Sequence, residues 1–202
     1  MNPARYATLA RRARASVRVV LAAAAVAVLS SCLVESEYPI HEPDVGAVDA
    51  DLLGEWMMAA DDVKGPSGRI LFLSSGGAML VLVFGPDKEF EESYEAYASE
   101  YGGAGWLDIR RPVFVDGRHE PGASEGTWLI AWYQVRGSSL AIRLLDLEAV
   151  SDAIRCGELA GTPSDGGLAT ATLTGPTADI RRFIEAHPGL EFLSEGAIEL
   201  ER

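Results

Sequence analysis

The chain has 202 residues, of which 30 are acidic and 17 are lysine or arginine, so its net charge at neutral pH is −13. A surface this acidic disfavours nucleic acid, whose phosphates select basic patches, and it repels anionic lipid headgroups. The length is enough for one domain with a core of its own, and we expect no second domain.

The first 31 residues are typical of a secretory leader. Basic residues without any acid precede an apolar run at 19–29, which is shorter than the roughly 20 residues of a membrane-spanning helix. The run ends in Leu29-Ser30-Ser31-Cys32, which resembles the lipobox of bacterial lipoproteins. That resemblance implies cleavage before Cys32 and a lipid on its thiol. An ordinary secretory cleavage site with a chance cysteine is the alternative.

The leader predicts a location. A lipidated Cys32 would hold the mature chain on a membrane, because two or three acyl chains anchor stably. Aspartate after the lipidated cysteine is the usual inner-membrane retention signal in enteric-type bacteria, and Val34 is not aspartate, so we expect the outer membrane, facing the periplasm. Cys156 then has no disulfide partner within the chain, and we expect it to be a small buried residue, with a reactive thiol as the alternative.

Residues 32–51 and 52–202 differ in composition and in hydrophobic pattern. The first stretch is acidic, contains Pro39 and Pro43, and has no sustained period, which predicts a lipidated, flexible tether. The second stretch predicts a globular domain of short β-strands. The strands we expect are residues 52–60, 69–75, 78–84, 127–135, 140–145, 169–173 and 197–200.

Two of these strands are apolar on both faces, which requires cover on both sides. They are residues 78–84 and 127–135, and Trp128 and Trp132 fall on one face of the second. Several antiparallel strands of this kind predict a mainly β fold: a small, closed antiparallel barrel with two short helices in the C-terminal half, at 147–156 and 177–186.

Two segments are less regular. In 90–110, aromatic residues recur at helical spacing, yet Gly102-Gly103 is a strong turn signal, and we favour a hairpin over a helix. Residues 112–126 are polar and are expected to form a long loop. That loop is either a contact surface or a tolerated insertion.

No residues form a convincing catalytic or metal site. Gly122-Ala123-Ser124-Glu125-Gly126 matches the nucleophile-elbow spacing of serine hydrolases, but it enters a strand where that motif opens a helix. The three histidines, His41, His119 and His187, are scattered and expected to be solvated. The acidic run that includes Glu95 is expected to be an exposed face. We therefore predict no enzyme, no metal and no cofactor.

Gly54-Glu55-Trp56 resembles the glycine-any-tryptophan signature of the first strand in lipocalins and related calycin barrels. The resemblance implies that Trp56 closes the barrel floor, with Arg202 packed over its ring. A plain core tryptophan is the alternative. Residues 52–202 are also similar to small bacterial lipoproteins of unknown activity that begin with a Leu-Gly-x-Trp strand. The shared features include Tyr133-Gln134-Val135 and Arg182-Phe183-Ile184.

These observations favour a membrane-anchored binding module for an apolar small molecule or acyl chain. Trp56, Trp128, Trp132 and Arg202 are its ligand-binding or barrel-core candidates. The alternative is an interaction protein that docks an envelope partner through its acidic face or the 112–126 loop. A barrel cavity of roughly 300 Å³ or more favours the ligand, and a filled interior favours the docking role.

Overall fold

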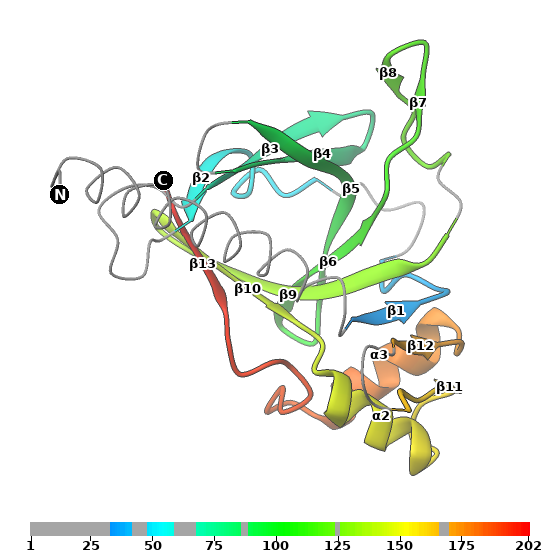
Figure 1. The fold of residues 1–202 in the computed structure, drawn as a ribbon. Helices are drawn as coiled ribbons and strands as arrows, with labels where there is room; N and C mark the ends of the chain where they lie inside the picture. Colours follow the sequence, from blue (N-terminus) through cyan, green and yellow to red (C-terminus); the bar gives the residue numbers. More distant parts are fainter. Residues whose placement is uncertain (1–32, 42–47, 59–67, 86–88, 124–125, 166–169) are drawn as a thin grey trace, which may run out of the picture.

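The computed structural model describes residues 33–41, 48–58, 68–85, 89–123, 126–165 and 170–202. The leader with Cys32 and the residue Ser124 lie outside the described residues. The described chain is mainly β-structure with two helices (Figure 1). Neither helix is long and apolar enough to cross a membrane. The strands are β1 (Val34–Ser36), β2 (Gly54–Met58), β3 (Arg69–Ser75), β4 (Ala78–Phe84), β5 (Phe90–Tyr101), β6 (Ala104–Arg110), β7 (Phe114–Val115), β8 (Arg118–His119), β9 (Trp128–Arg136), β10 (Ser139–Leu144), β11 (Gly161–Thr162), β12 (Ala171–Leu173) and β13 (Ile198–Glu201).

Eight antiparallel strands close a barrel, as the sequence predicts. Their order is β10-β13-β2-β3-β4-β5-β6-β9, and pairing of β9 with β10 closes the circle. Three short strands extend the sheet from one side of β9: β1 pairs antiparallel with β9 and parallel with β12, and β11 follows. The barrel is therefore the body of the domain, with a small β extension on its flank.

Glycine turns set the register of the two hairpins at the centre of the barrel sheet. Gly76-Gly77 joins β3 to β4 and Gly102-Gly103 joins β5 to β6, all four with positive φ, which suits glycine in tight hairpin turns. The hairpin expected at 90–110 is confirmed. Its aromatic residues do not mark a helix face, because Tyr94 packs toward the barrel core whereas Tyr97 stacks on His41 outside it.

Two hydrophobic clusters share the barrel wall. One fills the barrel interior and has members on all eight barrel strands, among them the fully buried Trp56, Met79 and Leu140. The other lies between the outside of the wall and the helices, and includes Trp106 and Ile130, with Trp132 packed against it. The cover predicted for both faces is therefore present for β9, whereas in β4 only the inward Met79 and Val81 join a cluster, and Leu80 and Leu82 on the other face are partly buried.

The placement expected for Trp128 and Trp132 is wrong. Side chains alternate along a strand, and in β9 it is Ala131 and Tyr133 that enter the interior, whereas Ile130 and Trp132 belong to the outer cluster. Trp128 meets side chains outside the barrel as well. Outside the wall, Trp132 packs against the cluster beneath the helices, and Trp128 packs with His41 and Arg110.

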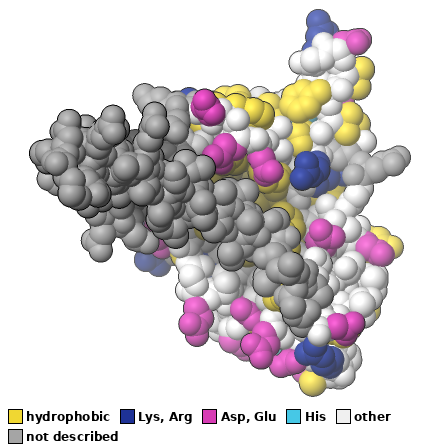
Figure 2. Space-filling model, in the orientation of Figure 1, with side chains coloured by type: hydrophobic (Ala, Val, Ile, Leu, Met, Phe, Trp, Pro, Cys, Tyr) yellow, Lys and Arg dark blue, Asp and Glu magenta, His cyan; other side chains and the backbone are white. Residues whose placement is uncertain are grey.

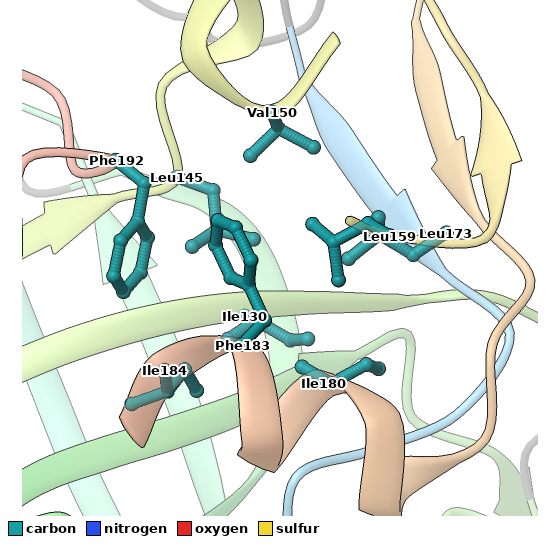
Figure 3. A pocket seen from close by; sticks show the side chains of 9 residues that line it. All are labelled: Ile130, Leu145, Val150, Leu159, Leu173, Ile180, Phe183, Ile184 and Phe192. Atoms are coloured by element: carbon teal, nitrogen blue, oxygen red, sulfur yellow. The ribbon is translucent and has the colours of Figure 1, made fainter. Parts of the chain in front are cut away.

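The helices are confirmed as α2 (Leu147–Arg155) and α3 (Thr177–Ala186). The Asp146 side chain caps α2 by accepting a hydrogen bond from the Ala149 N–H at 2.9 Å. A pocket between the helices and the barrel wall is lined only by apolar side chains, with Phe183 and Ile130 near its centre (Figure 3). Its volume is about 10 Å³, room for about one water molecule and for no larger ligand.

The predicted tether at 32–51 is wrong for the residues that the structure describes there. Val34 and Ile40 are buried, at 5% and 0% exposure, and β1 is hydrogen-bonded on both sides. Asp49 accepts a hydrogen bond from the Tyr133 hydroxyl at 2.6 Å. The segment is acidic and proline-containing, yet it docks because β9 and β12 offer it backbone partners, which no local pattern reveals. Residues 42–47 lie outside the described part.

Candidate functional site: a buried carboxylate and histidine cluster beneath a projecting hairpin

The most unusual chemistry in the described chain lies on the outer wall of the barrel, where Glu95 and Asp108 have no exposed surface. They come from β5 and β6, which pair Glu95 with Arg110 and Tyr97 with Asp108. Residues directly opposite share one face of a sheet. This face points outward, since the intervening Ala96 and Leu107 belong to the interior cluster.

Glu95 is the centre of the first half of the cluster. The Arg110 guanidinium donates to its Oε1 through Nε at 2.9 Å and Nη2 at 2.7 Å, and the Tyr97 hydroxyl donates to the same oxygen at 2.8 Å. His119 Nε2 lies 2.8 Å from Oε2, and the Gly122 N–H approaches both oxygens at 3.2 and 3.3 Å. The carboxylate is therefore satisfied on both oxygens.

These partners determine how Glu95 titrates. Burial by itself raises the pKa of its carboxyl, but hydrogen bonds from Arg110, Tyr97 and His119, together with the Arg110 charge, outweigh burial and lower the pKa below its ordinary value. Conversely, burial and the hydrogen bond to Glu95 raise the pKa of the Tyr97 hydroxyl. Glu95 is thus held ionised, which suits an anchor and does not suit a general acid.

Asp108 is the centre of the second half. Its Oδ1 accepts the Ile40 N–H at 2.8 Å, and its Oδ2 accepts the His41 N–H and lies 2.8 Å from His41 Nδ1. The carboxylate therefore fastens residues 40–41 to the barrel wall. The same segment is held from α3, where Thr177 donates to the Pro39 carbonyl at 2.7 Å and Arg181 to the Ile40 carbonyl at 2.9 Å.

Aromatic rings join the two halves. The His41 ring stacks on Tyr97, with centroids 4.5 Å apart and planes 3° apart, and Trp128 meets His41 edge-on at 5.3 Å. Arg110 lies 4.1 Å from the centroid of the Trp128 ring. One cluster thus ties together the barrel wall, the chain at 40–41 and the 112–126 segment.

That segment carries a small hairpin, which the expectation of a plain loop missed. β7 and β8 pair Phe114 with His119 and Val115 with Arg118, around a turn in which Asp116 and Gly117 have positive φ. The hairpin projects from the barrel at the end away from the helices (Figure 1). His119 holds its base, bonding Glu95 on one ring nitrogen and Ser75 Oγ, at 2.9 Å, on the other.

Two large apolar side chains on β7 are exposed. Phe114 and Val115 have 48% and 51% of their surface exposed. In the space-filling view, apolar atoms appear on the projecting segment next to charged ones at its tip (Figure 2). The hairpin therefore presents two exposed apolar side chains on β7, behind a charged turn, on a base that His119 fixes to the barrel wall.

Several expectations for site residues are corrected here. His41 and His119 are buried partners of carboxylates and not solvated loop residues, and Glu95 is buried although it belongs to an acidic run. Counting outward by equal steps from the Gly102-Gly103 turn pairs Glu95 with Arg110, so the sequence held a signal for that ion pair. It held none for His41, whose partner is 67 residues away.

The remaining candidates are placed as follows. Arg202 lies 4.2 Å from the centroid of the Trp56 ring, which confirms the predicted stacking, and Trp56 Nε1 donates to the Leu52 carbonyl at 2.7 Å. Cys156 is exposed, so the expectation that it is buried is wrong. His187 is partly exposed, 3.5 Å from Glu158. Within the described residues, no three histidine, cysteine, aspartate or glutamate side chains are arranged to hold a metal ion.

Comparison with known proteins adds no relative, since no family model, curated protein or solved structure matches the chain.

Proposed function

We propose that this chain is a lipid-anchored envelope protein that docks a protein partner through the β7–β8 hairpin. The observation that carries the proposal is the pair of exposed side chains, Phe114 and Val115, on a hairpin whose base is fixed by the buried Glu95 cluster. Apolar side chains that enter a partner's pocket supply much of the energy of protein interfaces, and a rigid mount lowers the entropy lost on binding.

The barrel interior supports docking more than ligand capture. A barrel fold is compatible with a small-molecule binding module, but here Trp56, Phe72 and Met79 fill the described interior with 2% exposure or less. The apolar pocket outside the wall, at about 10 Å³, is far below the roughly 300 Å³ of a typical ligand site.

The leader supports the anchor and the location. Its basic start, its apolar run and Leu29-Ser30-Ser31-Cys32 favour export and lipidation of Cys32, and Leu33-Val34, with no aspartate after the cysteine, favours the outer membrane with the domain in the periplasm. The acidic surface repels anionic lipid. Attachment in this proposal therefore comes from the acyl chains alone.

The test is site-specific photocrosslinking in cells that express the full chain. A photoreactive phenylalanine at Val115 is expected to give one discrete protein adduct, and the same group at Phe90 is the control. Phe90 is somewhat more exposed than Val115, at 57% against 51%, but starts β5 on the barrel. A Phe114→Ser variant should remove the Val115 adduct without changing the unfolding midpoint, because half-exposed side chains contribute little to stability.

Three results would contradict the proposal. Equal adducts from both positions would mean that the surface is not selective. Adducts to lipid alone would place the hairpin on the membrane. Reproducible excess mass on the purified domain under native conditions, lost on denaturation, would favour the small-molecule role.

A further inference from the structure

The chain is fixed to the domain from its first described residue. The Ala171 N–H donates to the Leu33 carbonyl at 3.3 Å, and the next residues pair on both sides, Val34 with Ala171 and Glu35 with Leu129. Val34 is 5% exposed. Backbone pairing to the β extension therefore begins at Leu33 itself.

Cys32 is joined to Leu33 by a peptide bond. Two extended residues reach about 7 Å, so a lipid on Cys32 holds the start of β1 at the membrane surface. A flexible tether of about 20 residues would instead give a root-mean-square reach of about 25 Å. Because residues 33–41 are folded onto the domain, a lipid on Cys32 would hold the domain close to the membrane and restrict its rotation, which a flexible tether would not do.

We propose that the flank where β1 and β12 begin lies against lipid headgroups, so that the domain is held in one orientation with the β7–β8 hairpin pointing away from the membrane. This inference rests on the lipidation of Cys32 in the proposed function. The occupant of the flank is the headgroup layer, because Cys32, which carries the lipid in the proposed function, is bonded to Leu33 directly before β1.

The register of β1 gives the direction of the hairpin. Because β1 is antiparallel to β9 and Ser36 pairs with Trp128, the chain approaches Trp128 as it moves away from Leu33. Trp128 directly follows the segment that carries the hairpin, and that hairpin lies at the end of the molecule opposite the helices (Figure 1). The anchor is therefore at the end of β1 that lies away from Trp128, and the segment that carries the hairpin enters β9 at the other end.

Two exposed acids mark the two ends. Asp165 follows β11, which is antiparallel to β12 with Thr162 opposite Thr172, so the chain leaves β11 toward the start of β12 and the proposed membrane flank. Asp116 is in the turn of the β7–β8 hairpin. With Cys156 changed to serine, Asp165→Cys or Asp116→Cys leaves one thiol for labelling when Cys32 carries lipid.

The experiment uses the full processed protein, extracted from membranes and returned to phosphatidylcholine vesicles that contain a lipid with a nitroxide on its headgroup. A fluorophore at 165 is expected to be strongly quenched and one at 116 close to unquenched. Equal quenching at the two positions, or stronger quenching at 116, would overturn the orientation.

A linker variant is the matched control. Ten Gly and Ser residues inserted between Cys32 and Leu33 give a root-mean-square reach of about 18 Å, and quenching at 165 should fall toward the value at 116. The intact mass of each sample reports acylation. An unacylated chain refutes the lipid anchor and the orientation together, whereas an acylated chain with equal quenching refutes the orientation alone.

Discussion

Glu95 is a buried carboxylate with five donors from four residues, Arg110, Tyr97, His119 and Gly122. Breaking one side of a buried ion pair leaves the other charge without compensation. Here the uncompensated group would be the Arg110 guanidinium, whose side chain is only 10% exposed. The cluster therefore contributes to the stability of the fold, and its loss should lower the free energy of unfolding.

We expect Glu95→Gln to lower the free energy of unfolding at pH 7 by about 3 kcal/mol. The pKa of Glu95 is lowered in the folded state, so the unfolded chain takes up the proton first as pH falls. The contribution of Glu95 is thus complete above the unfolded pKa of about 4.3 and is lost as pH falls through the lower folded pKa. Urea unfolding of wild type and variant should show that the difference between their free energies of unfolding is largest at pH 7 and becomes smaller in steps below pH 5.

Glu91→Gln is the control for Glu95→Gln. Glu91 is an exposed acid on the same strand, and its substitution should change stability by less than about 0.5 kcal/mol. If the free energies of unfolding of wild type and Glu95→Gln differ by the same amount at every pH, the carboxylate charge is not what stabilises the cluster.

At the scale of elements, the segment at 33–41 behaves as part of the domain. It supplies β1, the fully buried Ile40 and both backbone donors that satisfy Asp108. Burial of a side chain such as Ile40 is worth about 1.5–3 kcal/mol. Removing the segment also leaves the Asp108 carboxylate without these partners.

A chain that begins at residue 42 is therefore expected to be at least about 3 kcal/mol less stable than one that begins at 33, as measured by urea unfolding followed by tryptophan fluorescence. Should the shorter chain fail to fold, Ile40→Ala in the longer one, with an expected cost of about 2–5 kcal/mol, keeps the question answerable. Equal stability of the two chains would mean that residues 33–41 are a tether after all.

At the scale of the whole molecule, two hydrophobic clusters share one barrel wall: the interior side chains Trp56, Phe72 and Met79 are at most 2% exposed, and the apolar pocket outside the wall has a volume of only about 10 Å³. We expect native mass spectrometry of residues 33–202 to show no added mass after incubation with fatty acids or phospholipids. The thermal midpoint should also stay unchanged, because a ligand that binds only the folded state would raise it. A raised thermal unfolding midpoint together with added mass would instead indicate that the barrel binds a small-molecule ligand.

Much of the barrel follows from local signals in the sequence. The bounds of β3 and β4 follow from two β-rich apolar runs separated by Gly76-Gly77, and the β5–β6 hairpin follows from Gly102-Gly103, because glycine accepts the positive φ of such turns. The two helices follow from apolar residues at helical spacing. The contact between Arg202 and Trp56 followed from a three-residue resemblance.

The sequence by itself determined the mainly β class, the hairpin turns and the helices, because each depends on residues close together in the chain, and its first 32 residues predict lipidation. Only the tertiary structure decided that β1 belongs to the sheet, that Trp132 faces outward and that His41 bonds Asp108. Those features depend on pairings across many residues. A three-residue strand or a lone histidine carries no periodicity, so its place is set by the partner that the folded wall presents.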